Sequence, residues 1–187
     1  MAARALLEER GLAALSMRAL AARLDVAPNA LYSHVASKAE LVDAVLDDVL
    51  GEVPTGGPAG EVRTGDPAGG EPDPARGLRA LLTATYEVLL AHPDLVPLYL
   101  ARQGAHGDNA QRLGAEMTQL LARADVREAA ARDALRVLVV FTIGFAAVGA
   151  HPTGERESGQ RPLADDDVRA GFTAGLDWLL AGILARP

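Results

Sequence analysis

Side chains that can hydrogen-bond to nucleic acid are concentrated in a short stretch near the start of this sequence. Between residues 16 and 38 lie a guanidinium at Arg18, an amide at Asn29 and an ammonium group at Lys38. Guanidinium and amide groups match the hydrogen-bonding atoms on base edges in the major groove, and basic groups also bind phosphates. The chemistry that these residue types favour is contact with a DNA duplex.

The pattern around these residues predicts two short helices joined by a tight turn. Ser16 is suited to N-cap a helix over about 17–24, and Pro28 fits the first turn of a second helix over about 28–35. Apolar residues at helical spacing form the expected inward stripe: Leu20, Val26, Leu31 and Val35. The second helix therefore turns short and polar side chains outward, as the recognition helix of a helix-turn-helix does.

One residue and three short segments between residues 11 and 41 form a pattern that is more specific than a general helix-turn-helix. They are Gly11 at the end of a first helix, Ser16–Arg18, Leu31–Val35 and Lys38–Leu41. This pattern resembles the tetracycline-repressor (TetR/AcrR) family of bacterial transcription regulators, whose most specific signature is the aliphatic-Tyr-x-His string followed by Lys and Leu. Two positions depart from the family: Asp25 stands where Gly is usual, and Ala27 stands where Ser or Thr commonly caps the recognition helix.

The resemblance implies a homodimer that binds a double-stranded DNA operator through two such heads. Tyr32, His34 and Lys38 would then contact backbone phosphates or thymine methyl groups. In the alternative, Tyr32 packs within the head and Lys38 is a solvated residue without a DNA contact. The predicted DNA-contacting residues are Ser16, Arg18, Pro28, Asn29, Ala30, Tyr32, Ser33, His34 and Lys38. Because a two-fold dimer presents its heads symmetrically, we expect a pseudo-palindromic operator.

The charge of the chain bears on what kind of DNA-binding protein this is. The net charge is −7, yet residues 16–38 carry Arg18, Arg23 and Lys38 against Asp25 alone, a local net charge of +2. An acidic protein gains little from phosphate neutralisation, which supplies non-specific affinity. A site-specific dimer is therefore favoured over a general DNA coater. The alternative is a helical protein-interaction module with a vestigial helix-turn-helix, which the acidic charge and the absence of a basic arm before the first helix favour slightly.

Composition and motifs exclude several other classes. The chain has 187 residues, 49% of them hydrophobic, and no cysteine. Its four histidines show no metal-ligand spacing, so we expect no metal and no cofactor. Catalytic signatures such as GxSxG, a P-loop, a dinucleotide fingerprint or HExxH are absent from the sequence, which argues against an enzyme. The longest uncharged apolar run, 137–150, is too short to span a membrane, so we expect a soluble cytoplasmic protein.

Helical periodicity continues through the rest of the chain and predicts an all-α fold of about nine helices. The expected helices cover about 2–10, 17–24, 28–35, 38–50, 75–91, 94–102, 109–123, 126–149 and 165–185. We expect Ser37 and Glu40 to cap the fourth helix and Asp108 to cap the seventh. Asp43 and Asp47 are expected on the solvent-exposed face of the fourth helix. We divide the chain into a helix-turn-helix domain (1–50), a flexible Gly/Pro-rich loop (51–77) and a ligand-binding and dimerisation domain (78–187).

The same resemblance implies an effector pocket and a dimer interface in the last of these domains. A small, largely apolar effector would change the spacing of the heads and release the operator, as in a repressor. Tyr99 falls about where the tetracycline repressor has a metal-chelating histidine, so a magnesium–drug chelate is not expected. The predicted pocket residues, each of which is plain core in the alternative, are Leu81, Thr85, Leu89, Tyr99, Arg102, Met117, Phe141 and Phe145.

The last two long helices carry the features expected of a dimer interface. Residues 137–150 have no charge, which predicts a helix buried on all sides, one side lining a cavity and another meeting a partner subunit. Gly171, Gly175 and Gly182 reduce helix propensity in the final helix, so close helix packing is the expected compensation. The predicted interface residues are Phe172, Leu176, Leu179 and Ile183.

Overall fold

The computed structural model describes residues 2–55, 73–102, 104, 106–150 and 164–185, and this part of the chain is helical throughout, without strands. The elements, in order, are α1 (Ala2–Ala14), α2 (Met17–Leu24), α3 (Pro28–Tyr32), α4 (Lys38–Leu50), α5 (Pro74–Ala91), the 3-10 turn η1 (Pro93–Leu95), α6 (Val96–Ala101), α7 (Asp108–Arg123), α8 (Glu128–Gly149) and α9 (Asp165–Leu184). The all-α prediction is confirmed.

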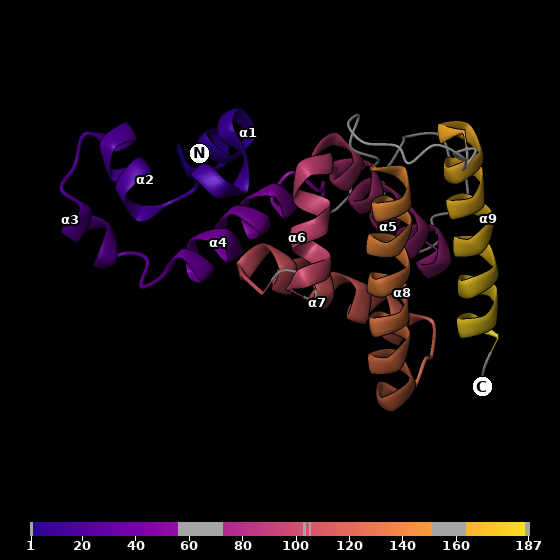
Figure 1. Ribbon diagram of the computed structural model, residues 1–187. Coiled ribbons are helices and arrows are strands. Elements are labelled where there is room, and N and C mark those ends of the chain that lie inside the picture. Colours follow the sequence, from indigo (N-terminus) through magenta and orange to yellow (C-terminus); the bar gives the residue numbers. More distant parts are fainter. Residues whose placement is uncertain (1, 56–72, 103, 105, 151–163, 186–187) are drawn as a thin grey trace, which may run out of the picture.

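A small N-terminal head, made of α1 to α3, lies at one end of the molecule, and a body made of α5 to α9 lies at the other (Figure 1). Helix α4 runs from the head into the body and packs against α1 on one side and against α5 and α7 on the other. One face of α4 is fully buried by these contacts, and it is the predicted apolar stripe: Leu41, Val42, Val45, Leu46, Val49 and Leu50. Helix α4 therefore connects the two parts through a continuous apolar core.

Local capping signals set the starts of three helices as predicted. The Ser16 hydroxyl accepts a hydrogen bond from the Ala19 amide, and the Ser37 hydroxyl accepts one from the Glu40 amide, both at 3.1 Å. The carboxylate of Asp73 accepts from the Ala75 amide at 3.1 Å. These bonds satisfy amide groups that the first turn of a helix leaves without a partner. Because α5 begins at Pro74, the last residues assigned to the 51–77 loop are helical, and most of that loop lies outside the described residues.

Two predicted boundaries differ in the head. Gly11 does not end α1 but kinks it, with φ 73° and ψ 173°, and helical backbone resumes as far as Ala14. Only glycine adopts that conformation readily, so the residue is conformationally required. Helix α3 ends at Tyr32, earlier than predicted, although the Val35 amide still donates to the Leu31 carbonyl at 2.9 Å. The recognition segment is a short helix followed by one further turn.

Aromatic rings join α5, α8 and α9. Tyr86 stacks on Phe172 with ring centroids 4.0 Å apart, and Phe172 also meets Phe141 and Phe145 of α8. A β-carbon added at Gly175 would lie 2.8 Å from the Phe141 ring, so α9 needs this glycine to approach α8. The close helix packing predicted for the glycines of α9 is confirmed at Gly171 and Gly175, and it occurs within one subunit.

Candidate DNA interface and effector cavity

The residues predicted to contact DNA lie on the surface of the head. Every one of them from Pro28 to Lys38 is exposed, and so is Arg18, whereas Ser16 is half-buried as the cap of α2. Tyr32 has an exposed fraction of 53%, so its ring is not packed within the head. The geometry thus leaves these side chains accessible to a ligand as large as a DNA duplex.

The turn between α2 and α3 shows the effect of both departures from the family pattern. Asp25 adopts the left-handed conformation, with φ 53° and ψ 44°, which explains why glycine is usual at this position. Ala27 occupies the N-cap position of α3 and makes no side-chain cap. Val26, predicted to point inward, is 42% exposed, so that prediction is wrong. The helix that carries the predicted base contacts is therefore weakly fixed at its start.

Replacing Ala27 by serine is expected to stabilise the protein by about 1 kcal/mol, since a serine hydroxyl at an N-cap satisfies a free amide of the first turn. The free energy of unfolding from chemical denaturation measures the change. Ala30→Ser, within the same helix, is the control and is expected to be neutral or slightly destabilising. Equal stabilities for the two variants would contradict the assignment of Ala27 as an uncapped N-cap.

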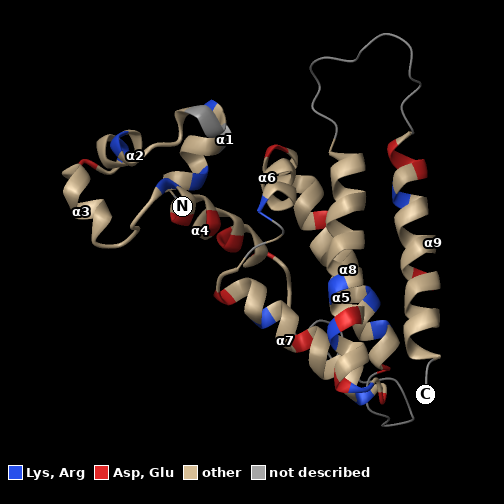
Figure 2. Ribbon diagram, turned by 60° about the horizontal axis from the view of Figure 1, so that its bottom comes forward, with Lys and Arg blue, Asp and Glu red and all other residues tan. Residues whose placement is uncertain are grey.

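The positive charge available on the head is smaller than the sequence suggests. The Arg23 guanidinium donates two hydrogen bonds, of 2.6 and 2.7 Å, to the Glu9 carboxylate of α1. The pKa of Glu9 is lowered by this hydrogen bond from Arg23. Among the described residues Arg18 makes no ion pair or hydrogen bond through its side chain, and α3 has no charged residue (Figure 2). Arg18 is therefore the basic side chain of α2 that stays available to a phosphate or a base.

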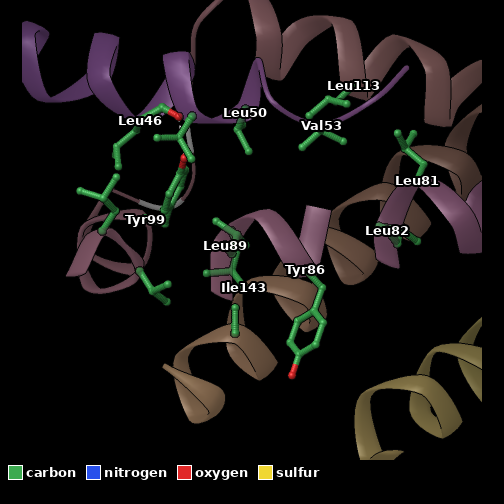
Figure 3. Packing of buried hydrophobic residues seen from close by; sticks show 14 of the residues in the cluster. Leu46, Leu50, Val53, Leu81, Leu82, Tyr86, Leu89, Tyr99, Leu113 and Ile143 are labelled. Atoms are coloured by element: carbon green, nitrogen blue, oxygen red, sulfur yellow. Dashed lines mark hydrogen bonds between the residues drawn. The ribbon is translucent and has the colours of Figure 1, made fainter. Parts of the chain in front are cut away.

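A cavity of about 190 Å³ lies in the body, between α5, α6, α7 and α8 and the end of α4. Four of the eight predicted pocket residues line it: Thr85, Leu89, Tyr99 and Met117. The prediction missed the rest of the wall, chiefly Leu50, Leu82, Leu113, Gly114, Leu135, Val139, Thr142 and Ile143. Figure 3 shows part of the buried apolar core, in which the cavity-lining residues Tyr99, Leu89 and Ile143 come from different helices.

The other four predicted pocket residues lie elsewhere, so the prediction is wrong for them. Leu81 is buried in the core beside the cavity without lining it, and Arg102 pairs with Asp43 of α4. Phe141 and Phe145 face α9 and pack on Gly171, Gly175 and Phe172. Helical periodicity marks these rings as inward-facing, but it does not tell which neighbouring helix covers them.

Polar contacts tie α4 to the walls of the cavity. The Tyr99 hydroxyl donates a hydrogen bond of 2.5 Å to the Leu46 carbonyl of α4 (Figure 3). Burial, and secondarily the nearby Asp47 carboxylate, raise the pKa of Tyr99, so the hydroxyl stays protonated. In the same region Arg102 after α6 forms a two-pronged ion pair with Asp43. Helix α6 thus touches both the cavity and α4.

Helix α7 is held to α4 by a cap that the sequence did not reveal. The Asp47 carboxylate accepts hydrogen bonds from the amides of Asn109, at 3.1 Å, and Ala110, at 2.9 Å. No side chain of α7 caps its own start, so the prediction that Asp108 does so is wrong. Asp43 and Asp47, predicted to be solvated, are instead bonded, Asp43 to Arg102 just after α6 and Asp47 to the start of α7, which packs on this side of α4.

A third polar cluster joins the head directly to the body. The Glu52 carboxylate, just after α4, pairs with Arg4 of α1 and lies 3.0 Å from the His92 ring nitrogen at the end of α5. Hydrogen bonds from His92 first, and then from Arg4, hold the pKa of Glu52 below its usual value. Movement of the head relative to the body must therefore break or rearrange charged contacts as well as the apolar ones.

Comparison with known proteins places this geometry in a family. Residues 1–45 match the family described as bacterial regulatory proteins, tetR family. A protein named HTH-type transcriptional regulator, from Saccharopolyspora erythraea, is 30% identical over 203 residues, covering 96% of this chain and 80% of that protein. This chain belongs to the tetR family. It is a DNA-binding transcriptional regulator with an N-terminal helix-turn-helix and a C-terminal helical domain.

Solved tetR-family structures resemble this regulator over nearly its whole length. BioQ of Mycobacterium smegmatis superposes with a TM-score of 0.73 at 26% identity, covering 100% of this chain and 95% of that one. Apo ActR from Streptomyces coelicolor gives 0.74 at 26% identity, with 98% and 91% covered. BioQ crystallised with its natural double-stranded DNA operator gives 0.67 at 26% identity, with 99% and 94% covered.

The tetR-family regulator exposes an apolar face along α8 and α9. Val140 of α8 is 65% exposed and Trp178 of α9 is 76% exposed. One side of α8 is therefore uncovered in a single subunit, and whether a partner covers it stays a prediction. A hollow of about 450 Å³ lies between the two helices beside Trp178. Of the predicted interface residues, Leu179 and Ile183 line this hollow. Phe172 and Leu176 are each 1% exposed inside the subunit, so assigning them to an interface is wrong.

The described part of the regulator contains neither a metal site nor a helix able to span a membrane. No group of three or more His, Asp or Glu side chains in this part of the chain is arranged to hold a metal ion. None of the helices described is long and apolar enough to cross a membrane. The sites that remain are the head surface, the cavity and the α8–α9 face.

Proposed function

We propose that the protein is a homodimeric repressor that binds a pseudo-palindromic operator and is released by a small, largely apolar effector. The observation that carries the proposal is the bond between Tyr99, a wall of the cavity, and the Leu46 carbonyl of α4, the helix that leads to the head. A molecule that occupies the cavity acts on the same helix that positions the recognition segment.

The DNA contacts in this proposal come from the exposed surface of the head. Arg18 and Lys38 would neutralise phosphates, and Asn29 at the start of α3 would read a base edge. The remaining contacts would come from the short side chains that let α3 approach the floor of the groove: Ser16, Pro28, Ala30, Tyr32, Ser33 and His34. The BioQ complex with its operator supports this use of the head, since that protein shares the fold.

A second copy of the chain would cover the apolar face of α8 and α9. Val137, Gly144 and Val148 fall on one side of α8, because spacings of seven and four residues return to the same helical face. Gly144, and Gly182 on α9, lie in helix interiors, yet an added β-carbon at either would have no described atom within 4 Å. Packing within the subunit does not explain these glycines, whereas close approach of a partner helix would.

The effector response follows from the contacts that surround the cavity. A ligand changes the balance between two conformations only through a difference in its affinity for them. The cavity touches α4 at Leu50 and through Tyr99, so a ligand that enlarges it would move α6 or α4. In a dimer, a change in the tilt of α4 alters the distance between the heads and their fit to successive major grooves.

Selection of binding sites from a random duplex pool tests the proposal. We expect recovery of an inverted repeat whose half-sites are about 10 base pairs apart, one helical turn. A panel of small molecules, screened by thermal shift and then for release of that duplex, identifies effectors. A pool that shows no enrichment would instead favour the helical interaction module with a vestigial helix-turn-helix.

Replacing Tyr99 by phenylalanine is expected to weaken the effector response about fivefold without abolishing effector binding. The variant keeps the ring in the cavity wall but loses a hydrogen bond worth about 1 kcal/mol to α4. The ratio of operator affinities with and without effector measures this coupling. Tyr86→Phe is the matched control, because Tyr86 is buried in α5 but does not line the cavity. Full coupling in Tyr99→Phe would contradict the role given to this bond.

A further inference from the structure

We propose that the cavity takes an uncharged, compact molecule about the size of one ring with a short substituent, and that Gly114 sets how large it can be. The inference rests on the effector response proposed above, because it names the chemistry of the molecule that the same cavity binds. Three observations carry it: the polar groups of the wall, the volume and the space at Gly114.

The wall offers hydrogen-bond acceptors but no charge. None of the described lining residues is ionised at neutral pH. The hydroxyls of Thr85 and Thr142 donate to the Leu81 and Leu138 carbonyls of their own helices, at 2.8 and 2.9 Å. With the Tyr99 hydroxyl also donating, to Leu46, all three oxygens retain lone pairs only. A ligand hydroxyl or N–H finds a partner here, whereas a carboxylate or ammonium group loses its hydration without an opposite charge.

The wall also makes no demand for a polar ligand atom. Every buried side-chain nitrogen or oxygen in the described residues already has a hydrogen-bond partner. A site built for a highly polar ligand instead leaves groups that only the ligand satisfies. Affinity in this cavity must therefore come mainly from apolar contact, with at most one or two hydrogen bonds that orient the molecule.

The volume limits the size of the occupant. An apolar cavity of about 150 Å³ in a protein core is known to hold benzene. The cavity here measures about 190 Å³, which leaves room for one ring and a few further atoms. Because the cavity is open on one side, a larger effector would either extend out of it or require the helices around it to separate.

Gly114 is the position on α7 where this limit is set. A glycine in a helix interior reduces stability by about 1 kcal/mol relative to alanine. Close packing explains Gly77, where an added β-carbon would lie 2.8 Å from Leu120, and Gly149, where it would lie 2.9 Å from Leu90. A β-carbon at Gly114 would have no described atom within 4 Å, and this residue lines the cavity. The missing side chain leaves room that the fold does not use.

Isothermal titration of the full-length protein without DNA tests the inference with three probes of similar size: benzyl alcohol, benzoate and benzylammonium. At neutral pH we expect benzyl alcohol to bind and the two ions to bind at least about tenfold more weakly. Gly114→Leu is expected to weaken benzyl alcohol binding at least tenfold, because the added side chain fills the cavity. Ala115→Leu, at the neighbouring exposed position of α7, is the control and should bind as the wild type does.

Three results would overturn the inference: no heat of binding with benzyl alcohol, ions that bind as tightly as the alcohol, or unchanged binding in Gly114→Leu. Thermal unfolding of each variant confirms that it is folded, and Gly114→Ala, which adds one carbon to the same wall, gives an intermediate loss of affinity. A separate assay distinguishes this inference from the proposed function. If benzyl alcohol binds as expected but leaves operator affinity unchanged, the effector response fails while the assignment of the cavity stands.

Discussion

Replacing Val140 by aspartate is expected to turn the regulator into a monomer and to weaken operator binding at least about 100-fold. The side chain of Val140 is 65% exposed in the subunit and lies beside Val137 on the apolar face of α8 and α9. In the proposed dimer this residue is covered by a second copy. Two-fold symmetry then places two carboxylates in one interface. Arg136 lines the same hollow as Val140, but it already pairs with Asp133 at 3.5 Å, so burying the two added charges disfavours association.

The loss of operator affinity follows from the loss of the second head. Joining two binding modules gains about 10²- to 10⁴-fold in avidity, because the second contact becomes intramolecular. A monomer has to bind each half-site separately. Sedimentation or light scattering measures the mass, and a gel shift with the full inverted repeat measures the affinity.

A second variant and a control separate interface effects from misfolding. Gly144→Leu adds no charge, and a β-carbon at this position has no described atom within 4 Å in its own subunit, so we expect the variant to fold and still obstruct a partner helix. Leu100→Asp places the same charge on an equally apolar position of α6 that is 50% exposed, away from this face, and should remain dimeric. A Val140→Asp protein that remains a dimer would contradict the interface.

The parts of the fold that local chemistry determines were predictable from the sequence. Ser16, Ser37 and Asp73 cap their helices because a side-chain oxygen at that position reaches an amide two or three residues away. The buried stripe of α4 follows from helical periodicity alone. The residues predicted to contact DNA come from a motif in which residue types and spacing are both specific, and the structure places them on the surface.

The contacts that connect head and cavity could not be predicted in this way. Tyr99 bonds to Leu46, and Asp47 caps α7, across 53 and 62 or more residues of chain respectively. The spacing of residues within one helix does not tell which acidic residue of its polar face will contact another helix. The charge of the aspartates on α4 predicted that they are solvated, but Arg102 and the start of α7 lie close enough to bond to Asp43 and Asp47.

The aromatic residues illustrate the same limit for apolar side chains. Phe141 and Phe145 are inward-facing, as their spacing predicts, but α9 covers them rather than the cavity. The glycines of α9 predicted that some helix approaches closely. They did not tell whether that helix belongs to the same subunit, as at Gly175, or to a partner, as we propose for Gly182.

The second large effect is expected from Arg18→Ala, which should weaken operator binding by about 100-fold or more. Among the described residues its guanidinium has no partner, so it can bind DNA without first breaking another hydrogen bond or ion pair. A hydrogen bond to a charged group contributes about 1.5–3 kcal/mol, and a dimer places two copies of Arg18 on the operator. The loss should be clear in a direct titration at moderate salt.

The salt dependence tells a phosphate contact from a structural role. The logarithm of the binding constant falls with the logarithm of salt concentration by about 0.9 for each phosphate that is neutralised. Losing two Arg18 contacts should therefore make the slope shallower by about 2. If Arg18 reads a guanine edge instead, the slope changes less and specificity at that base pair relaxes.

Arg23→Ala supplies the matched control, since Arg23 lies on the same helix and has the same chemistry. Its guanidinium is already held by the Glu9 carboxylate through two hydrogen bonds, so it has less to gain from a phosphate. We expect its removal to leave the salt slope nearly unchanged, although the head loses an exposed ion pair, which contributes little to stability. Equal slopes for Arg18→Ala and the wild type would exclude Arg18 from phosphate binding. With so few available cations on each head, we expect affinity for the operator to depend on shape and base contacts more than on charge.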